Sequence, residues 1–565
     1  MASVEVWEMA ALGSGLVAAV GAWALRARLQ PLHERLRGYE HPWAWDVVLV
    51  ALGLLWNVPA LLGAWRVLSP YGSPMGPDSD MNFFAAIALQ RGDLQMYGED
   101  RYPAFAWLAA TLADGLSGIP AAGMRLSMLS ALALGPAAYA LGRQLGGRAA
   151  GFASLTLALR LPGVADLGRQ FTPYAMVAAV DLVAVVALVA LLSGGGRVRV
   201  GLAALALVPC AALAFSAEPK QLPVALLLVV IGAPLLVLRD RLVGGVGALA
   251  LLATIPVMNR LLAAAKLPIY SLEEITSRVQ LGLSVDPALG TQGWSPGEPF
   301  AELFRSLYRV ATLVQPTPGQ GFLHRYVAEG FHMQTPHTSL VWALPVLGLL
   351  VLKGPSPRLA LLGLLPLGLV AWSTLHLHFQ HRYALAFVVV LPALAAAGLA
   401  RAGGAPAVLA TLAVTVLLPG SPWRGVAPGV TERAPNLSDS WAGREPPEWV
   451  TKAAEADEKL AGDGFVLDYG QSRPWTMLAA ARPFVRCTAT HDTCRSQLTR
   501  PGTLYAVLWP GERVSIREAP GAAALEGAVG APAQVGECWT RVMSRPENGG
   551  VYEWTCAQRP AAPTR

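Results

Sequence analysis

Long apolar segments separated by short polar turns fill most of the chain. A membrane-spanning helix needs about 20 mostly apolar residues to cross a hydrocarbon core of about 30 Å. The pattern predicts a polytopic α-helical membrane protein with about twelve transmembrane helices. These are expected near 5–25, 45–66, 123–142, 149–163, 172–193, 200–217, 221–238, 242–259, 338–352, 359–375, 383–400 and 405–419.

Composition supports this class. Of 565 residues, 54% are hydrophobic and only 14% are charged, with a mean hydropathy of +0.44. Soluble globular proteins carry about 25% charged residues, so a large soluble enzyme is excluded. Lys and Arg number 43 against 37 Asp and Glu, a net charge of +6. We explain this excess by the loops of a membrane protein, with no nucleic-acid partner.

Arginine and lysine predict the orientation. Six alternate short loops are basic, which places them in the cytoplasm by the positive-inside rule. Both termini, the long loops 67–122 and 260–337 and the tail from about 420 are then outside. Glu5 and Glu8 stand where a signal peptide would be basic, so segment 5–25 is expected to stay as a helix. The predicted location is the inner (plasma) membrane, multi-pass, with an extracytoplasmic C-terminal domain. The basic loops carry Arg26, Arg28, Arg35 and Arg37; Arg143 and Arg148; Arg197 and Arg199; Arg239 and Arg241; Lys353 and Arg358; and Arg401.

The tail is predicted to be a small α/β domain. Prolines and glycines make 421–446 a linker, and the domain covers 447–565, with a helix at 447–461 and strands at 464–469 and 503–509.

Four of the five cysteines, Cys487, Cys494, Cys538 and Cys556, lie in this predicted C-terminal domain. An outside location favours two disulfides, for which three pairings exist, Cys487–Cys494 with Cys538–Cys556 being the most local. Zinc is the alternative, although no CxxC spacing is present. Cys210, in an apolar segment, is expected to be a packed thiol.

The first outer loop carries paired carboxylates. Asp78 and Asp80 precede an apolar helical pattern, and a second begins at Tyr102-Pro103; we expect both helices to lie in the membrane interface. One carboxylate could act as general base on an acceptor hydroxyl, and the other could bind a divalent cation or orient the acceptor. The alternative is a solvated Asp-rich turn in which Asp80 caps the helix.

Three cations stand at the outer ends of predicted helices, where positive charge is disfavoured. They are Arg169, Lys220 and Arg382. Together they would suit a lipid-linked phosphate; the alternative is side chains reaching for the headgroups. His376, His378 and His381 are either metal ligands or interfacial residues at a helix end.

These features together resemble the GT-C superfamily of membrane glycosyltransferases, which includes protein O-mannosyltransferases and the lipid A aminoarabinose transferase. The matches are Asp78-Ser79-Asp80, Tyr102-Pro103, the arginine-led span at 124–154, Lys220, and Arg382-Tyr383. The resemblance covers about 45–420, as a GT-C-like catalytic domain. The helix and basic loop at 1–44 are additional to the family pattern, and the consecutive acidic pair of bacterial members is absent.

The resemblance implies sugar transfer from a polyprenyl-phosphate carrier to an acceptor at the outer face, in one inverting displacement. Asp80 or Asp78 would be the base, and Lys220, Arg382 and Arg169 would stabilise the leaving phosphate. Tyr102 and Tyr383 would contact substrate. The acceptor (glycan, lipid or protein), the sugar and the need for a divalent metal stay open. No nucleotide-binding motif is found.

The main alternative is a transporter or flippase for a lipid-linked sugar. It predicts ionisable residues in mid-span, for which Arg160 and Asp181 are the candidates, and symmetry between the two halves. We find no such symmetry in the spacing of the segments. A polysaccharide ligase and a membrane-anchored assembly protein are further readings.

Overall fold

The fold is described from a computed structural model. The residues that it describes are 28, 31, 43–65, 82, 85–90, 92, 103–115, 118–161, 164, 167–168, 171–194, 196–217, 221–265, 385, 389–417, 465–468, 484–486, 504–508, 533–535, 537–544 and 550–556.

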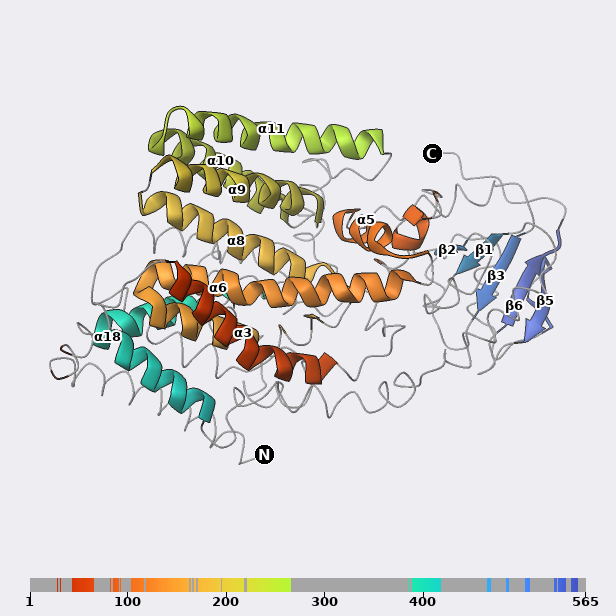
Figure 1. Ribbon diagram of the computed structural model, residues 1–565. Coiled ribbons are helices and arrows are strands. Elements are labelled where there is room, and N and C mark those ends of the chain that lie inside the picture. Colours follow the sequence, from red (N-terminus) through yellow and green to blue (C-terminus); the bar gives the residue numbers. More distant parts are fainter. Residues whose placement is uncertain are drawn as a thin grey trace, which may run out of the picture.

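The described chain is mostly helical, and a small sheet lies at one end of the helices (Figure 1). Four helices among the described residues are long and apolar enough to cross a membrane, at Ala121–Leu159, Tyr174–Leu192, Arg197–Ala217 and Val243–Ala264. At 1.5 Å per residue the second of these is about 29 Å long, close to the thickness of a hydrocarbon core. A multi-pass membrane protein is therefore supported. The total of twelve spans stays a prediction, because segments 5–25, 338–352 and 359–375 lie outside the described residues.

The helices follow the predicted segments closely. Their bounds are α3 Ala44–Trp65, α5 Pro103–Leu112, α6 Ile119–Leu159, α8 Tyr174–Leu192, α9 Arg197–Ala217, α10 Leu222–Arg239, α11 Val243–Ala264 and α18 Leu391–Leu417. The expected segments 123–142 and 149–163 are the two parts of α6, and 405–419 is the second part of α18. One expectation was inaccurate at its end, because the helix expected to reach 163 ends at Leu159. The expected start at 383 lies outside the described residues, and Leu385, the first described residue there, is helical.

Gly147 turns α6 back on itself. Its φ of 84° and ψ of −175° belong to a region that only glycine occupies readily. A Cβ atom added to Gly142 would overlap Ser154, and one added to Gly151 would lie 2.9 Å from the carbonyl oxygen of Tyr139. These contacts pair positions before the turn with positions after it, so α6 is a tight antiparallel hairpin. Gly404 gives α18 the same backbone conformation.

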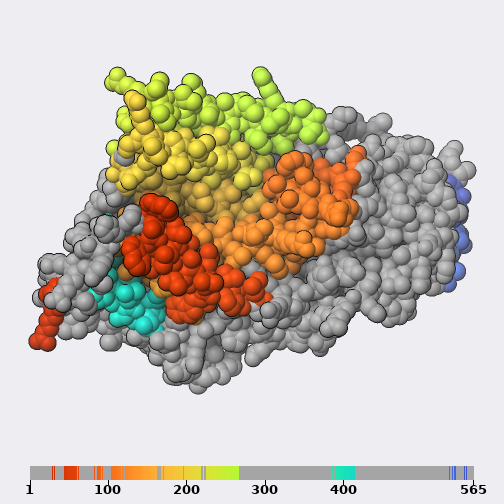
Figure 2. Space-filling model, in the orientation of Figure 1, coloured from red at the N-terminus to blue at the C-terminus, as the bar shows by residue number. Residues whose placement is uncertain are grey.

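Contacts with α6 organise the described helices. The hairpin packs against α3, α5, α8 and α18, and α8 leads on to a layer of α9, α10 and α11. Figure 2 shows α3 lying over α6 and beside α18, with α11 along the opposite edge. Val246 and Leu249 of α11 expose about two thirds of their surface, at 67% and 69%. Such large exposed apolar side chains on a spanning helix are expected to face lipid.

The turns within α6, between α8 and α9 and between α10 and α11 lie at the end of the bundle away from the sheet (Figure 1). Arginines occur at each of these turns, and we call this end the basic end. It is defined by Arg143, Arg148, Arg197, Arg199, Arg239 and Arg241, which lie at the turns of α6, α8–α9 and α10–α11.

Asp240 links two of these turns. Its carboxylate accepts hydrogen bonds from the backbone N–H groups of Val243 (2.9 Å) and Leu242 (3.0 Å), and from Nε of Arg197 (3.1 Å). These bonds, chiefly that from Val243, hold the pKa of Asp240 below its ordinary value. The carboxylate therefore caps the first turn of α11.

The C-terminal residues form a mixed six-stranded sheet with the order β2-β1-β3-β6-β5-β4. β1 is parallel to both β2 and β3, whereas β3–β6, β6–β5 and β5–β4 are antiparallel. The predicted strands at 464–469 and 503–509 are β1 and β3; the other four were not predicted. The strands are β1 Phe465–Asp468, β2 Phe484–Arg486, β3 Leu504–Leu508, β4 Gln534–Val535, β5 Trp539–Ser544 and β6 Gly550–Trp554.

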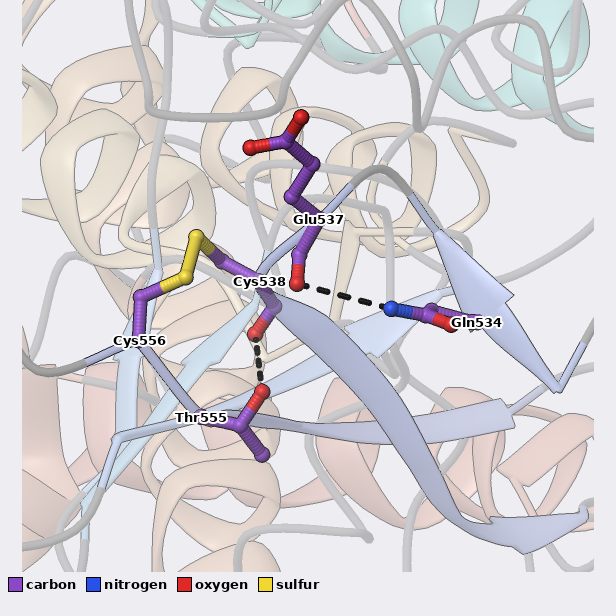
Figure 3. The surroundings of a disulfide bond; sticks show 5 residues. All are labelled: Gln534, Glu537, Cys538, Thr555 and Cys556. Carbon is purple, nitrogen blue, oxygen red and sulfur yellow. Dashed lines mark hydrogen bonds between the residues drawn. A yellow bond between two sulfur atoms is a disulfide. The ribbon is translucent and has the colours of Figure 1, made fainter.

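A disulfide joins Cys538 to Cys556 at one end of the β5–β6 pair (Figure 3). Beside it, the backbone N–H and the hydroxyl of Thr555 both donate to the carbonyl oxygen of Cys538, at 2.8 and 3.1 Å. The disulfide confirms one of the two pairings predicted as the most local. The alternative prediction, that these two cysteines are zinc ligands, is wrong. Cys487 and Cys494 lie outside the described residues, as does the helix expected at 447–461.

Candidate functional site

The end of the bundle nearest the sheet, which we call the α5 end, is where the predicted outer loops begin and finish (Figure 1). α5 packs against α6 and against α9. α8 and α10 both begin at this end, because each runs antiparallel to α9 through a short connection. The α5 end is thus opposite the basic end, as the sequence predicts for an outer face.

Aromatic and hydroxyl contacts tie the α5 end together. The ring of Phe171 meets the ring of Phe105 edge to face, with centroids 5.4 Å apart. The hydroxyl of Ser127 donates to the carbonyl oxygen of Thr172 at 3.2 Å. Gly123 leaves room for the Phe171 ring, which an added Cβ would overlap. The short segment before α8 is therefore fixed between α5 and the start of α6.

Several polar side chains are buried next to the predicted loop residues. Asn82, Thr172 and Gln221 expose 0%, 1% and 5% of their surface. Within the described chain, Oγ1 of Thr172 and Oε1 of Gln221 have no hydrogen-bond partner. A buried polar atom without a partner costs about 1–3 kcal/mol. These oxygens are accordingly expected to meet a polar group, either from the rest of the chain or from a substrate.

The helix at 85–90 packs on α5 through Gln90, whose side-chain amide donates to the carbonyl oxygens of Ala110 and Ala113 at 3.5 Å each. Ala85, Ala86, Ile87 and Ala88 are fully buried. Both segments of the first outer loop that were predicted as helices therefore contain helical residues that are packed in the structure.

None of the predicted catalytic or binding residues lies among the described residues. The structure neither brings them together nor separates them. In sequence, Tyr102 adjoins Pro103 of α5, Lys220 adjoins Gln221, and Arg169 precedes Phe171 by two positions. The predicted set is Asp78, Asp80, Tyr102, Arg169, Lys220, Arg382 and Tyr383.

A second set of buried polar residues, Arg160 and Asn57, lies inside the bundle, and only Arg160 was predicted from the sequence. Arg160 was noted as a mid-span charge, but its partner was not. Its Nε donates to Oδ1 of Asn57 at 2.7 Å, and its guanidinium lies 4.8 Å from the centre of the Trp56 ring. Asn57 is 1% exposed and Arg160 is 7% exposed. The signal available in the sequence was Asn57 itself, an amide within the apolar run of α3, because a buried polar residue needs a hydrogen-bond partner.

Asp181 and Cys210 are two further buried side chains in the described helices. Asp181 is 7% exposed and Cys210 is 5% exposed. Cys210 is a buried free thiol, as predicted. Within the described residues, no three His, Cys, Asp or Glu side chains come together to hold a metal ion. The histidines at 376, 378 and 381 lie outside them, and a divalent metal stays a prediction.

Comparison with known proteins gives one informative likeness. No protein-family model and no curated protein matches the chain. Among solved structures, the crystal structure of ArnT from Cupriavidus metallidurans bound to undecaprenyl phosphate covers 93% of this chain and 100% of its own, with a TM-score of 0.51 and 13% identity. ArnT is a GT-C glycosyltransferase. The chain therefore has a fold similar to that of ArnT.

Weaker likenesses are to the oligosaccharyltransferase of Archaeoglobus fulgidus. Its apo form has a TM-score of 0.45 with 13% identity, covering 83% of this chain and 70% of that one. Its complex with Zn and sulfate has a TM-score of 0.44 and 13% identity, covering 80% and 67%. The ArnT likeness spans both chains almost completely, so the C-terminal part is included in the comparison.

Proposed function

We propose that this protein is an integral membrane glycosyltransferase that moves a sugar from a polyprenyl-phosphate-linked donor to an acceptor at the outer face of the membrane. The observation that carries the proposal is the likeness to ArnT along both chains, in a structure bound to undecaprenyl phosphate. A fold shared at 13% identity does not by itself transfer an activity. The residue types in the outer loops supply the chemical part of the proposal.

The proposed reaction has two requirements. The acceptor hydroxyl is a weak nucleophile, so a base must take its proton, and we assign this role to Asp80 or Asp78. The departing polyprenyl phosphate needs its charge stabilised, and we assign this role to Lys220, Arg382 and Arg169. A single displacement of this kind inverts the anomeric carbon. Tyr102 and Tyr383 are proposed to contact substrate, and a divalent metal at Asp78 and Asp80 is an optional addition.

The α5 end is the proposed location of this chemistry. Tyr102, Lys220 and Arg169 adjoin described residues of that end in sequence, and Gln221 and Thr172 there have buried oxygens that suit a polar ligand. We further propose that this end and the sheet are extracytoplasmic. The arginine content of the opposite end supports this orientation, and the disulfide between Cys538 and Cys556 is typical of an oxidising compartment.

A flippase for a lipid-linked sugar is the second candidate, favoured by the buried Arg160 and Asp181. However, Arg160 is bonded to Asn57 and lies over Trp56, both on α3, which gives it a role in joining α3 to α6. The two functions differ in their product. A transferase separates the sugar from its prenyl carrier, whereas a flippase leaves the donor intact.

The test replaces Asp80 and Asp78 separately by Asn and measures sugar transfer from a radiolabelled polyprenyl-phosphate donor in membranes. Loss of a general base should lower the rate about 10²- to 10⁴-fold. Asp114→Asn is the matched control, because Asp114 is an exposed carboxylate later in the same loop. Full activity in both Asp78 and Asp80 variants would remove the proposed base. Lys220→Ala and Arg382→Ala should raise the donor concentration required.

A further inference from the structure

At the basic end, the turn between α8 and α9 is joined to the turn between α10 and α11 by two hydrogen bonds. Nε of Arg197 donates to Oδ2 of Asp240 at 3.1 Å. Nη2 of Arg239 donates to the carbonyl oxygen of Leu192 at 2.8 Å. The two turns are therefore held together as one unit. We call its four arginines the paired-turn arginines: Arg197, Arg199, Arg239 and Arg241.

The two turns carry more positive than negative charge. Among their described residues, 192–194, 196–199 and 239–243, four arginines and one carboxylate give a net charge of +3. Arg197 is paired with that carboxylate, Asp240. Arg239 donates to a backbone carbonyl, and so does Arg199, whose Nη1 lies 2.7 Å from the oxygen of Gly194. A carbonyl group carries no net charge, so these two bonds position the guanidinium groups without neutralising them.

The surface of this unit is positive. All four paired-turn arginines are exposed. The side chain of Arg197 is 73% exposed, whereas that of its partner Asp240 is only 15% exposed. The carboxylate is therefore covered, while the guanidinium groups reach the surface.

Two apolar stripes lead to these turns along the outside of the bundle, one on α9 and one at the start of α11. In each stripe the second and third residues follow the first by four and seven positions, a spacing that places them on one face of a helix. All six side chains are between 62% and 78% exposed, as expected of residues that face lipid. The stripes are Val198, Leu202 and Leu205, and Leu242, Val246 and Leu249.

Each stripe begins beside an arginine. Val198 stands between Arg197 and Arg199, and Leu242 follows Arg241. α9 has 21 residues and is about 32 Å long, so its first turn lies at the edge of a hydrocarbon core of about 30 Å. The paired-turn arginines are thus at the level of the lipid headgroups, directly above a surface suited to acyl chains.

We propose that the paired-turn arginines bind the phosphate of an anionic phospholipid in the leaflet that surrounds the basic end, with its acyl chains along the two stripes. Arginine is well suited to phosphate, and basic sites between membrane helices bind anionic headgroups. The bonds that join the turns hold the guanidinium groups in place before the lipid arrives, which lowers the entropy lost on binding.

The occupant is a membrane lipid, because a soluble phosphate ester would leave the apolar stripes unused. It also differs from the proposed sugar donor, because the site is at the end of the bundle opposite the α5 end. The inference requires only that the bundle spans a membrane, and it is independent of the proposed sugar transfer.

The test measures binding of phosphatidylglycerol to the full-length protein in detergent by native mass spectrometry, with phosphatidylethanolamine, which has no net charge, as the comparison. Phosphatidylglycerol should bind more tightly. Arg199→Gln and Arg239→Gln should each weaken its binding about five-fold, equivalent to about 1 kcal/mol, and together about 25-fold. Binding of phosphatidylethanolamine should change less than about two-fold in each variant.

Arg401→Gln is the matched control, because it removes the same charge from an exposed position on α18, which packs against α6. It should stay within about two-fold of the original protein. An equal loss in Arg401→Gln and Arg199→Gln would mean general attraction to exposed arginine and would overturn the site. Equal binding of the two lipids would do the same, and so would displacement of bound phosphatidylglycerol by excess glycerol phosphate, its soluble headgroup.

A second variant covers the case in which Arg239→Gln fails to fold through loss of the bond to Leu192. Arg239→Lys keeps the charge, and phosphatidylglycerol binding within about two-fold of the original is expected. A five-fold loss in Arg239→Lys would contradict a site that depends on charge.

Discussion

The buried bond between Arg160 and Asn57 gives the sharpest prediction about stability. Asn57 is 1% exposed and Arg160 is 7% exposed, so the bond between them lies inside the helix bundle. Replacing Asn57 by Leu keeps the number and branching of the side-chain heavy atoms but removes the acceptor of a 2.7 Å bond from a charged group that is 7% exposed.

Two reference values bound the expected cost. Hydrogen bonds to charged groups contribute about 1.5–3 kcal/mol in proteins, while interhelical bonds in membranes average about 0.6 and reach about 1.7 kcal/mol. Arg160 keeps its contact with Trp56, so we expect Asn57→Leu to lower the free energy of unfolding by about 1.5 kcal/mol. Most of this loss should disappear when Arg160 is already replaced by Met, because the charged donor is then absent.

The assay is reversible unfolding in mixed micelles of a mild detergent and SDS, for the two single variants and the double variant. Asn259→Leu is the matched control, since Asn259 is an exposed amide on α11, and it should change stability by less than about 0.5 kcal/mol. A coupling energy near zero between positions 57 and 160, or an equal cost at Asn259, would refute the reasoning.

Three further predictions concern the turns and the sheet. Gly147→Ala should lower the free energy of unfolding by about 1–3 kcal/mol, because alanine rarely adopts the conformation at φ 84°. Gly245→Ala, inside α11 with open space around it, should raise that free energy by about 0.5–1 kcal/mol. Equal effects of the two substitutions in thermal unfolding would contradict the explanation from backbone conformation. The lowered pKa of Asp240 means that its charge stabilises the fold above its ordinary pKa of 3.8 and that this contribution is lost as the pH falls through the lowered pKa. The original protein should therefore exceed Asp240→Asn in melting temperature at neutral pH and converge with it in acid; a constant difference would count against this. Cys538 and Cys556 are 18 residues apart, and reducing the bond between them should destabilise the sheet by about 3 kcal/mol. The measurement is the rate of proteolysis within the sheet, which should rise in the presence of reductant. A rate of proteolysis that reductant does not change would show that the bond is not structural.

The apolar pattern was sufficient to locate most described helices, because a spanning segment must be both long and apolar. The ends were less accurate where residues outside the pattern decide them. The second part of α6 ends at Leu159, just before Pro162 and Gly163, which are a local stop signal that the apolar pattern does not include. The tight hairpin at Gly147 likewise depends on small residues meeting across it, such as Gly142 and Ser154.

The sheet was only partly predictable. The continuous apolar runs at β1 and β3 identify two central strands. β5 (WTRVMS) and β6 (GVYEW) show neither a continuous apolar run nor a regular polar–apolar alternation. A disulfide joins this pair, and the sequence spacing left that pairing among three alternatives. The candidate site depends on residues from distant loops, so its assembly is a tertiary property that no single motif determines.

The central claim is that this protein separates a sugar from a polyprenyl phosphate. The most direct measurement incubates the purified full-length protein in lipid nanodiscs with a doubly labelled donor, carrying one label on the sugar and one on the prenyl chain. The account predicts that the two labels part, with free polyprenyl phosphate accumulating in step with a glycosylated acceptor, and that Asp78→Asn and Asp80→Asn together abolish this. Labels that stay joined while the donor crosses the membrane would contradict the account and identify a flippase.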